Sequence, residues 1–138
     1  MNIENTLNYG ICILKANKIP NPYLDSEILL SESIKKDKKH IILNSKEILS
    51  RKQLDSFNDF IERRKKGEPI AYLIKKKEFW KDEFYISKDV LIPRPDTELI
   101  VEQVLKIYSQ ESQLQVLDIG TGSGCILLSI LKERLNFY

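Results

Sequence analysis

The stretch V-L-D-I-G-T-G-S-G-C at residues 116–125 constrains the fold of this chain more than any other feature. An apolar run that ends in D-x-G-x-G-x-G is typical of a buried strand that turns sharply into a helix. Glycines at alternate positions let the backbone bend and approach a ligand without a Cβ in the way, and the free N–H groups of the following helix point at what is bound there. The sequence therefore predicts a nucleotide-cofactor cradle formed by Asp118, Gly120, Thr121, Gly122, Ser123 and Gly124.

The spacing of the glycines narrows the kind of cofactor. The dinucleotide fingerprint G-x-G-x-x-G would require glycine where this chain has Cys125, so hydride chemistry is disfavoured. A phosphate-binding P-loop would require a lysine and a hydroxyl residue after its last glycine, and neither follows Gly124. An acidic residue two places before the first glycine, as Asp118 is, resembles instead the first motif of S-adenosylmethionine-dependent methyltransferases, in which it would serve the cationic methionine end of the cofactor. The same residues, taken alone, also fit a plain strand-to-helix turn.

Three further segments precede the glycine turn. They are G-E-P-I-A-Y-L at residues 67–73, E-F-W at 78–80 and V-L-I-P-R-P-D-T-E-L at 90–99. In this order they resemble the release factor glutamine methyltransferase family (PrmC/HemK), weakly near the N-terminus and strongly over residues 63–133. The resemblance implies S-adenosyl-L-methionine as the methyl donor. It also implies class I peptide-chain release factors as the partner, methylated on the side-chain amide of the glutamine in their G-G-Q loop.

The predicted fold class is α+β, with an N-terminal helical bundle, a β-hairpin linker, and then the first helix, strand and helix of a Rossmann-like methyltransferase domain. The predicted domains are residues 1–74, a helical domain for substrate recognition; 75–95, the hairpin and a proline-rich linker; and 96–138, the incomplete start of the methyltransferase domain. Apolar residues at helical spacing do not distinguish a core face from a binding face. A self-contained bundle therefore remains the alternative to a recognition domain, and no recognition residue is predicted.

Caps and apolar spacing outline the helical domain. A first amphipathic helix is expected to end before Pro20, and Asn21 with Pro22 is a plausible start of a second helix. A short third helical stretch is expected near residues 46–49, and Ser50 is expected to open a longer helix with a capping box that ends at Gly67. The side chains predicted to face inward are Ile3, Leu7, Ile11, Leu14 and Ile19 in the first helix, Leu24, Ile28 and Leu29 in the second, and Leu54, Phe57 and Ile61 in the long one.

From residue 77 the apolar period becomes that of strands, which predicts a β-hairpin with its turn at residues 81–83. Trp80 is interpreted as an anchor of this hairpin, with contact to a ligand as the alternative. Two prolines make residues 92–95 a stiff extended connection. Asp96 is predicted to cap the next helix, whose buried stripe would be Ile100, Val101, Val104, Leu105 and Tyr108. The resemblance places Phe79, Arg94 and Pro95 at the substrate pocket; the alternative for Arg94 is plain exposure to solvent.

Two elements of the family's chemistry are absent from the sequence. The family grips the target amide with an N-P-P-Y motif, and no N-P-P-Y occurs here, so no catalytic residue is assigned. An acidic residue at the end of a second strand, which would hold the cofactor's ribose, is also missing. The chain is therefore expected to be an N-terminal portion that is catalytically incomplete alone, with residues 114–138 marginally stable. Two alternatives remain, namely a relative that methylates another amide or amine, and a non-catalytic binding module.

Composition and residue spacing argue against nucleic-acid binding, metal binding and insertion into a membrane. Basic runs such as residues 35–39 and 63–66 are interpreted as solvated faces because acidic residues balance them nearly one for one, with 22 Lys and Arg against 20 Asp and Glu. Cys12 and Cys125 show no metal or disulfide spacing, and the single histidine, His40, has no evident catalytic partner. No apolar run is long enough to cross a bilayer, and no signal peptide is evident. We expect a cytoplasmic protein without a metal and without direct contact to nucleic acid or membrane.

Overall fold

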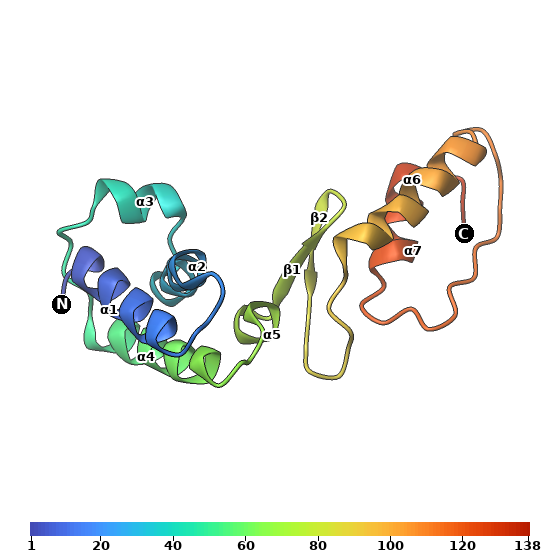
Figure 1. Ribbon diagram of the computed structural model, residues 1–138. Coiled ribbons are helices and arrows are strands. Elements are labelled where there is room, and N and C mark those ends of the chain that lie inside the picture. The colour runs from blue at the N-terminus through green and yellow to red at the C-terminus, as the bar shows by residue number, and fades with distance from the viewer. The chain divides into compact units, whose positions relative to one another are not determined.

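The chain folds into two compact units, Met1–Ile74 and Lys75–Tyr138, in a computed structural model that describes all residues 1–138. All the regular elements of the first unit are helices (Figure 1). The second contains an antiparallel two-stranded hairpin followed by helices. The predicted helical bundle and hairpin are thus confirmed, whereas a Rossmann-like sheet is not evident.

The N-terminal unit contains α1 (Ile3–Ala16), α2 (Pro22–Ile34), α3 (Lys38–Leu43), α4 (Arg51–Lys65) and α5 (Ile70–Ile74). Helices α1, α2 and α4 pack against one another around a core in which Leu14, Leu29 and Phe57 are fully buried. The inward placement predicted for Leu24 is wrong, because this side chain is 51% exposed. Its neighbours Asp25 and Ser26 are buried instead, so the inner face of α2 begins with polar residues.

Local capping chemistry forms the ends of α4 as predicted. The Ser50 hydroxyl accepts from the Gln53 N–H, and the Gln53 side chain accepts from the Ser50 N–H, which is a complete capping box. At the other end the Gly67 N–H donates to the Arg64 carbonyl and the Glu68 N–H to the Arg63 carbonyl. This hydrogen-bond pair is a Schellman motif, and Gly67 adopts the φ of +91° that it requires.

The third helix lies earlier in the chain than predicted. It begins after Asp37, whose carboxylate accepts from the His40 N–H at 2.9 Å, and it ends at Leu43. Residues 46–49 are not helical because they pair with the N-terminus, where the Ile3 N–H donates to the Glu47 carbonyl at 3.0 Å. A tertiary contact has replaced the helical hydrogen bonds there.

Gly10 marks the closest approach inside the bundle. A Cβ added at this position would lie 2.6 Å from Cζ of Phe57, 3.1 Å from Cδ1 of Ile61 and 3.1 Å from Oγ of Ser26. Real Cβ atoms essentially never lie 2.6 Å from another heavy atom, so any larger residue at position 10 would displace the Phe57 ring in the core between α1, α2 and α4.

The second basic run takes part in ion pairs of the N-terminal unit. Arg64 Nε donates to Asp25 Oδ2 at 2.7 Å, and its Nη1 donates to the Glu68 carbonyl at 3.1 Å. Arg63 pairs with the Glu68 carboxylate through two hydrogen bonds, and this raises the pKa of Arg63 above its ordinary value. Interpreting this run as a solvated face was therefore wrong for Arg64, whose side chain is only 16% exposed.

The C-terminal unit contains β1 (Lys76–Phe79), β2 (Asp82–Tyr85), a 3₁₀ turn η1 (Pro95–Thr97), α6 (Glu98–Ile107) and α7 (Cys125–Glu133). Phe79 pairs with Asp82 across the hairpin, so the turn is Trp80 and Lys81 and lies one residue earlier than predicted. The predicted cap is also wrong, because Asp96 lies inside η1 and α6 begins at Glu98 without a side-chain cap. Of the predicted stripe only Val101 is fully buried, and Ile100 is 51% exposed.

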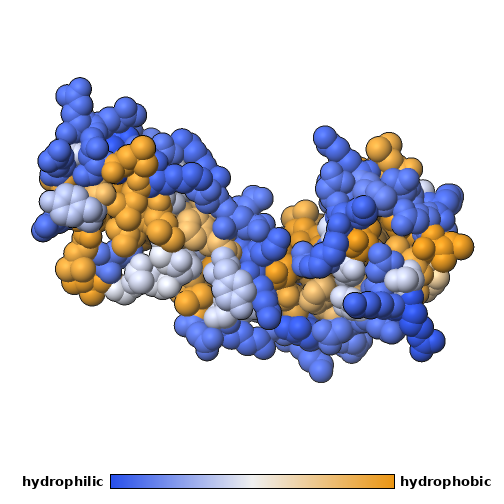
Figure 2. Space-filling view, turned by 180° about the vertical axis from the view of Figure 1, so that it is seen from behind, coloured by the Kyte–Doolittle hydropathy of each residue, from blue (hydrophilic) through white to orange (hydrophobic).

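The buried strand expected at residues 116–119 is not formed. Leu117 and Ile119 are 83% and 88% exposed, and the only sheet is the hairpin. The Tyr138 N–H donates to the Leu114 carbonyl at 3.0 Å and the Val116 N–H to the Tyr138 carbonyl at 2.8 Å, which is the hydrogen-bond pattern of one rung of a parallel ladder. A parallel strand needs paired edges and two covered faces, and a single rung supplies neither. Figure 2 shows the resulting apolar surface on this unit, on the left of that view.

Candidate functional site

The glycine turn joins an irregular segment to the N-terminus of α7. Gly120, Gly122 and Gly124 have φ values of +80°, +56° and +76°, a region that L side chains rarely adopt. A Cβ at Gly120 would meet no atom within 4 Å, and one at Gly122 would meet only a backbone oxygen at 3.9 Å. Space is therefore open where these Cβ atoms would lie, and the backbone is free to approach a ligand there.

Two polar atoms in this turn are buried without a partner. Neither Oδ2 of Asp118 nor Oγ of Ser123 has a hydrogen bond in the structure. A buried carboxylate oxygen without a donor is costly, so Asp118 Oδ2 is an acceptor that a ligand, an ion or water can satisfy. Thr121 and Gly122 are exposed beside them, and the Gly124 N–H donates to the Thr121 carbonyl at 2.8 Å. The turn thus brings the predicted cradle residues together and leaves an acceptor unused.

The hairpin turn is held by two carboxylates from different helices. The backbone N–H of Trp80 donates to Glu98 Oε1 at 2.9 Å, and its indole N–H donates to Glu133 Oε1 at 3.0 Å. Lys81 Nζ lies 2.5 Å from the same Glu133 oxygen and 5.8 Å from the centroid of the indole ring. These contacts within the unit support the interpretation of Trp80 as an anchor.

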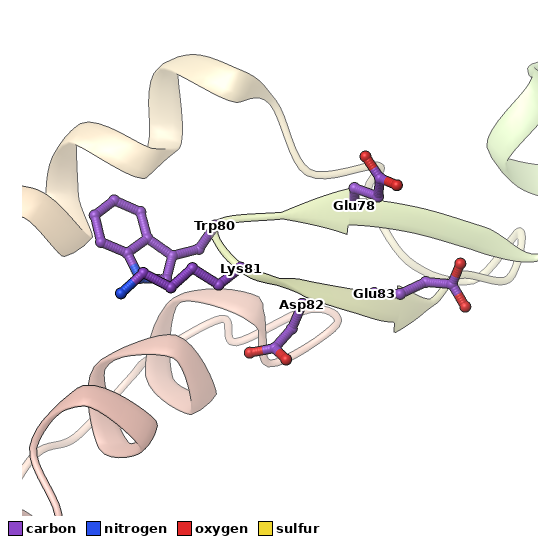
Figure 3. Close-up of a pocket in the computed structure, with 5 residues that line it drawn as sticks. All are labelled: Glu78, Trp80, Lys81, Asp82 and Glu83. Atoms are coloured by element: carbon purple, nitrogen blue, oxygen red, sulfur yellow. The ribbon is translucent and has the colours of Figure 1, made fainter.

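A hollow of about 340 Å³ lies at the hairpin and is lined by Glu78, Trp80, Lys81, Asp82 and Glu83. Figure 3 draws these five side chains on the two strands and their turn. Glu78 and Glu83 stand opposite each other across the two strands. Phe79 does not line this hollow, because it is 1% exposed and its ring packs edge-on against Phe84. In this unit Phe79 is therefore a core side chain, and its predicted place at a substrate pocket stays a prediction.

A second hollow, of about 320 Å³, lies where the hairpin meets the start of α6. It is lined by Trp80, Pro95, Asp96, Glu98, Leu99 and Glu102. Pro95 is thus on a concave surface, whereas the adjacent Arg94 is exposed and makes no ion pair within the unit. The extended φ and ψ of Arg94, −99° and 143°, agree with the stiff connection expected between two prolines.

The sequence analysis did not predict the structural roles of three residues, Glu98, Glu133 and Arg134. Arg134 Nη2 donates to the Leu105 carbonyl at 2.7 Å and its Nε to the Tyr108 carbonyl at 3.1 Å, so it caps the C-terminus of α6. Nothing in the sequence near residue 133 indicates these partners, which lie 26 or more residues away. Only the position of Glu98 in the first turn of a predicted helix was a usable signal.

The contacts of Glu133 with Lys81 and Trp80 predict how the fluorescence of the protein changes with acid. Hydrogen bonds from Lys81 and Trp80 hold the pKa of Glu133 below its ordinary value of 4.5. A carboxylate with a lowered pKa stabilises the folded state fully above its ordinary pKa, and this stabilisation is lost as pH falls through the lower folded value. We therefore expect the emission of Trp80, the only tryptophan, to change with the protonation of Glu133 only below pH 4.5.

This titration is measured as the difference between the unchanged protein and Glu133→Gln. Every contribution that the two proteins share cancels in this difference, which leaves the contribution of Glu133. A difference spectrum that titrates above pH 4.5 would contradict the assigned ion pair.

Comparison with known proteins places these features in a family. The family model described as the PrmC N-terminal domain matches residues 5–74. A release factor glutamine methyltransferase from Buchnera aphidicola subsp. Baizongia pistaciae is 45% identical over 136 residues, which is 99% of this chain. The chain belongs to the release factor glutamine methyltransferase (PrmC) family. The family model covers the helical unit only, whereas the alignment with the Buchnera protein also includes the glycine turn.

Other relatives agree with this membership. A release factor glutamine methyltransferase from Coxiella burnetii is 42% identical over 95% of the chain, and a protein named bifunctional methyltransferase from Rickettsia bellii is 36% identical over 97% of it. The chain covers 49% and 47% of the Buchnera and Coxiella proteins and 29% of the Rickettsia protein. It thus spans about half the length of the release factor methyltransferases that it matches. No helix of the structure is long and apolar enough to span a membrane, and no three potential metal-ligand side chains are grouped together.

Proposed function

We propose that this protein takes part in S-adenosyl-L-methionine-dependent methylation of the glutamine side-chain amide in the G-G-Q loop of class I peptide-chain release factors. The observation that carries the proposal is a match over 99% of the chain to a release factor glutamine methyltransferase, a match that includes the glycine turn. The relatives with the same name in Coxiella and Caulobacter support it over 95% and 88% of the chain.

The cofactor assigned by this proposal fits the residues of the turn. Asp118 offers a buried acceptor without a donor, which suits the cationic amino group of the methionine end. Gly120 and Gly122 leave open space where a Cβ would otherwise lie, and the N-terminus of α7 presents unpaired N–H groups. Bound there, the cofactor would supply an electrophilic sulfonium methyl group.

The chain's own contribution to the reaction is binding and orientation. An amide nitrogen is a poor nucleophile because its lone pair is delocalised, so the target amide has to be held in line and shielded from water. We assign Arg94 and Pro95 to the rim of the substrate pocket, because a rigid loop holds an unpaired cation and a concave wall next to each other. The helical unit Met1–Ile74 is proposed to recognise the release factor.

The test is methyl transfer by the protein at the full length that its gene encodes. Labelled methyl from S-adenosyl-L-methionine is expected on the glutamine of the G-G-Q loop of a class I release factor, and a glutamine-to-alanine release factor is expected to stay unlabelled. Mass spectrometry of the loop peptide locates the group. Equal labelling of the two release factors, or labelling of another substrate only, would contradict the assignment.

A further inference from the structure

We propose that Glu98 and Glu133 are positioning residues that clamp the hairpin turn against α6 and α7 and thereby set the wall of the substrate pocket. The role of the two glutamates in the reaction rests on the proposed function. The clamp itself rests only on contacts inside the C-terminal unit. The two carboxylates come from opposite ends of different helices, yet both accept a hydrogen bond from the same residue, Trp80.

The conformation of Trp80 shows that this clamp works against a local preference. Its φ of +57° lies in the left-handed region, which is unfavourable for a bulky residue that has a Cβ. Such strain persists only where the surroundings over-determine the conformation, and it concentrates at functional sites. The two-residue hairpin turn requires this positive φ at its first residue, and the two glutamates hold the backbone N–H and the indole N–H of that residue.

Charged contacts extend the clamp to the rest of the turn. Lys81 pairs with Glu133, and Asp82 pairs with Lys132 one residue earlier on α7. Arg134, next to Glu133, holds the last carbonyls of α6. The end of α7 therefore contacts the hairpin through Glu133 and the C-terminus of α6 through Arg134.

The clamp is expected to affect the predicted substrate pocket through two neighbouring residues, Phe79 and Pro95. Phe79 directly precedes Trp80 and is buried, so the turn sets its position. Pro95 lines the hollow that Trp80 and Glu98 also line. Releasing the turn should therefore displace the substrate wall while leaving the glycine turn, and with it cofactor affinity, unchanged.

The first experiment measures the clamp in the 138-residue chain by hydrogen exchange at the Trp80 amide. Glu98→Ala removes the acceptor and is expected to raise the exchange rate about tenfold or more, whereas Glu98→Gln keeps an acceptor oxygen and should restore slow exchange. Glu102→Ala is the matched control, because Glu102 lies one turn further along α6 and pairs with Lys106. Unchanged exchange in Glu98→Ala would overturn the clamp, as would equally fast exchange in the control.

The second experiment measures the role in the reaction with the protein at its full encoded length. Glu98→Ala and Glu133→Leu are expected to lower kcat/KM for a class I release factor about tenfold, with the Kd for S-adenosyl-L-methionine within about twofold of the unchanged protein. Glu98→Gln should recover most of the activity. Full activity in a variant whose Trp80 amide exchanges fast would overturn the positioning role. If the unchanged protein transfers no methyl group, the proposed function fails and this role with it, while the exchange rates still decide the clamp.

Discussion

Replacing Arg64 with methionine is expected to destabilise the helical unit by about 3 kcal/mol. Methionine retains much of the apolar volume of the arginine stem but leaves the Asp25 carboxylate, whose side chain is 8% exposed, without its donor at 2.7 Å. An unpaired buried charge costs more than the pair contributes, so losing one partner is the harmful change. The effect is measured as the free energy of unfolding in urea, followed by far-UV circular dichroism.

Two further variants show whether the buried pair is the cause. Arg51→Met makes the same substitution on α4 at a pair that is 3.9 Å apart and 93% and 67% exposed, and it should cost less than about 0.5 kcal/mol. Adding Asp25→Leu to Arg64→Met should recover most of the lost stability, because neither charge is then left buried. Equal losses for Arg51→Met and Arg64→Met would refute the argument.

The second large effect is expected at the glycine turn. Gly122→Val should lower the affinity for S-adenosyl-L-methionine about 100-fold or more in the protein at its full encoded length. A β-branched residue at a φ of +56° is a severe outlier, and its side chain would extend into the open space beside the turn, where the cofactor is proposed to bind. Isothermal titration calorimetry measures the change directly.

Gly67→Val is the matched control for this effect. Gly67 also has a positive φ, +91°, and also has open space around it, but it ends α4 in the helical unit. Its replacement should reduce the stability of that unit by about 1–2 kcal/mol and leave the affinity for the cofactor unchanged. Cofactor affinity retained in Gly122→Val would favour a plain strand-to-helix turn over a cradle.

Local signals in the sequence predicted those elements whose hydrogen bonds lie within a few residues. The capping box at Ser50 and the glycine at position 67 define both ends of α4 because their partners are three to five residues away. Pro22 likewise opens α2 at its first position, although Asn21 makes no side-chain cap. The glycine turn was equally local, and its φ values are those that its spacing requires.

Elements that depend on distant partners were predicted less well. Residues 46–49 looked helical but pair with residues 1–4, and Leu24 faces outward where Asp25 and Ser26 turn inward. The apolar residues near Leu117 have strand character, yet a strand exists only when a neighbour accepts its hydrogen bonds. The two-stranded hairpin formed because each of its strands is the other's partner across a two-residue turn.

By itself, the sequence determined the family, the helical bundle, the hairpin and the sharp bend at the glycine turn, because each depends on motifs or on short-range hydrogen bonds. Tertiary structure alone decided that Arg64 is matched to Asp25, 39 residues away, and that Glu98 and Glu133 hold Trp80 across 18 and 53 residues. The reason is physical. A charged side chain can pair with any opposite charge that packing brings within reach, and its own sequence neighbourhood does not specify which.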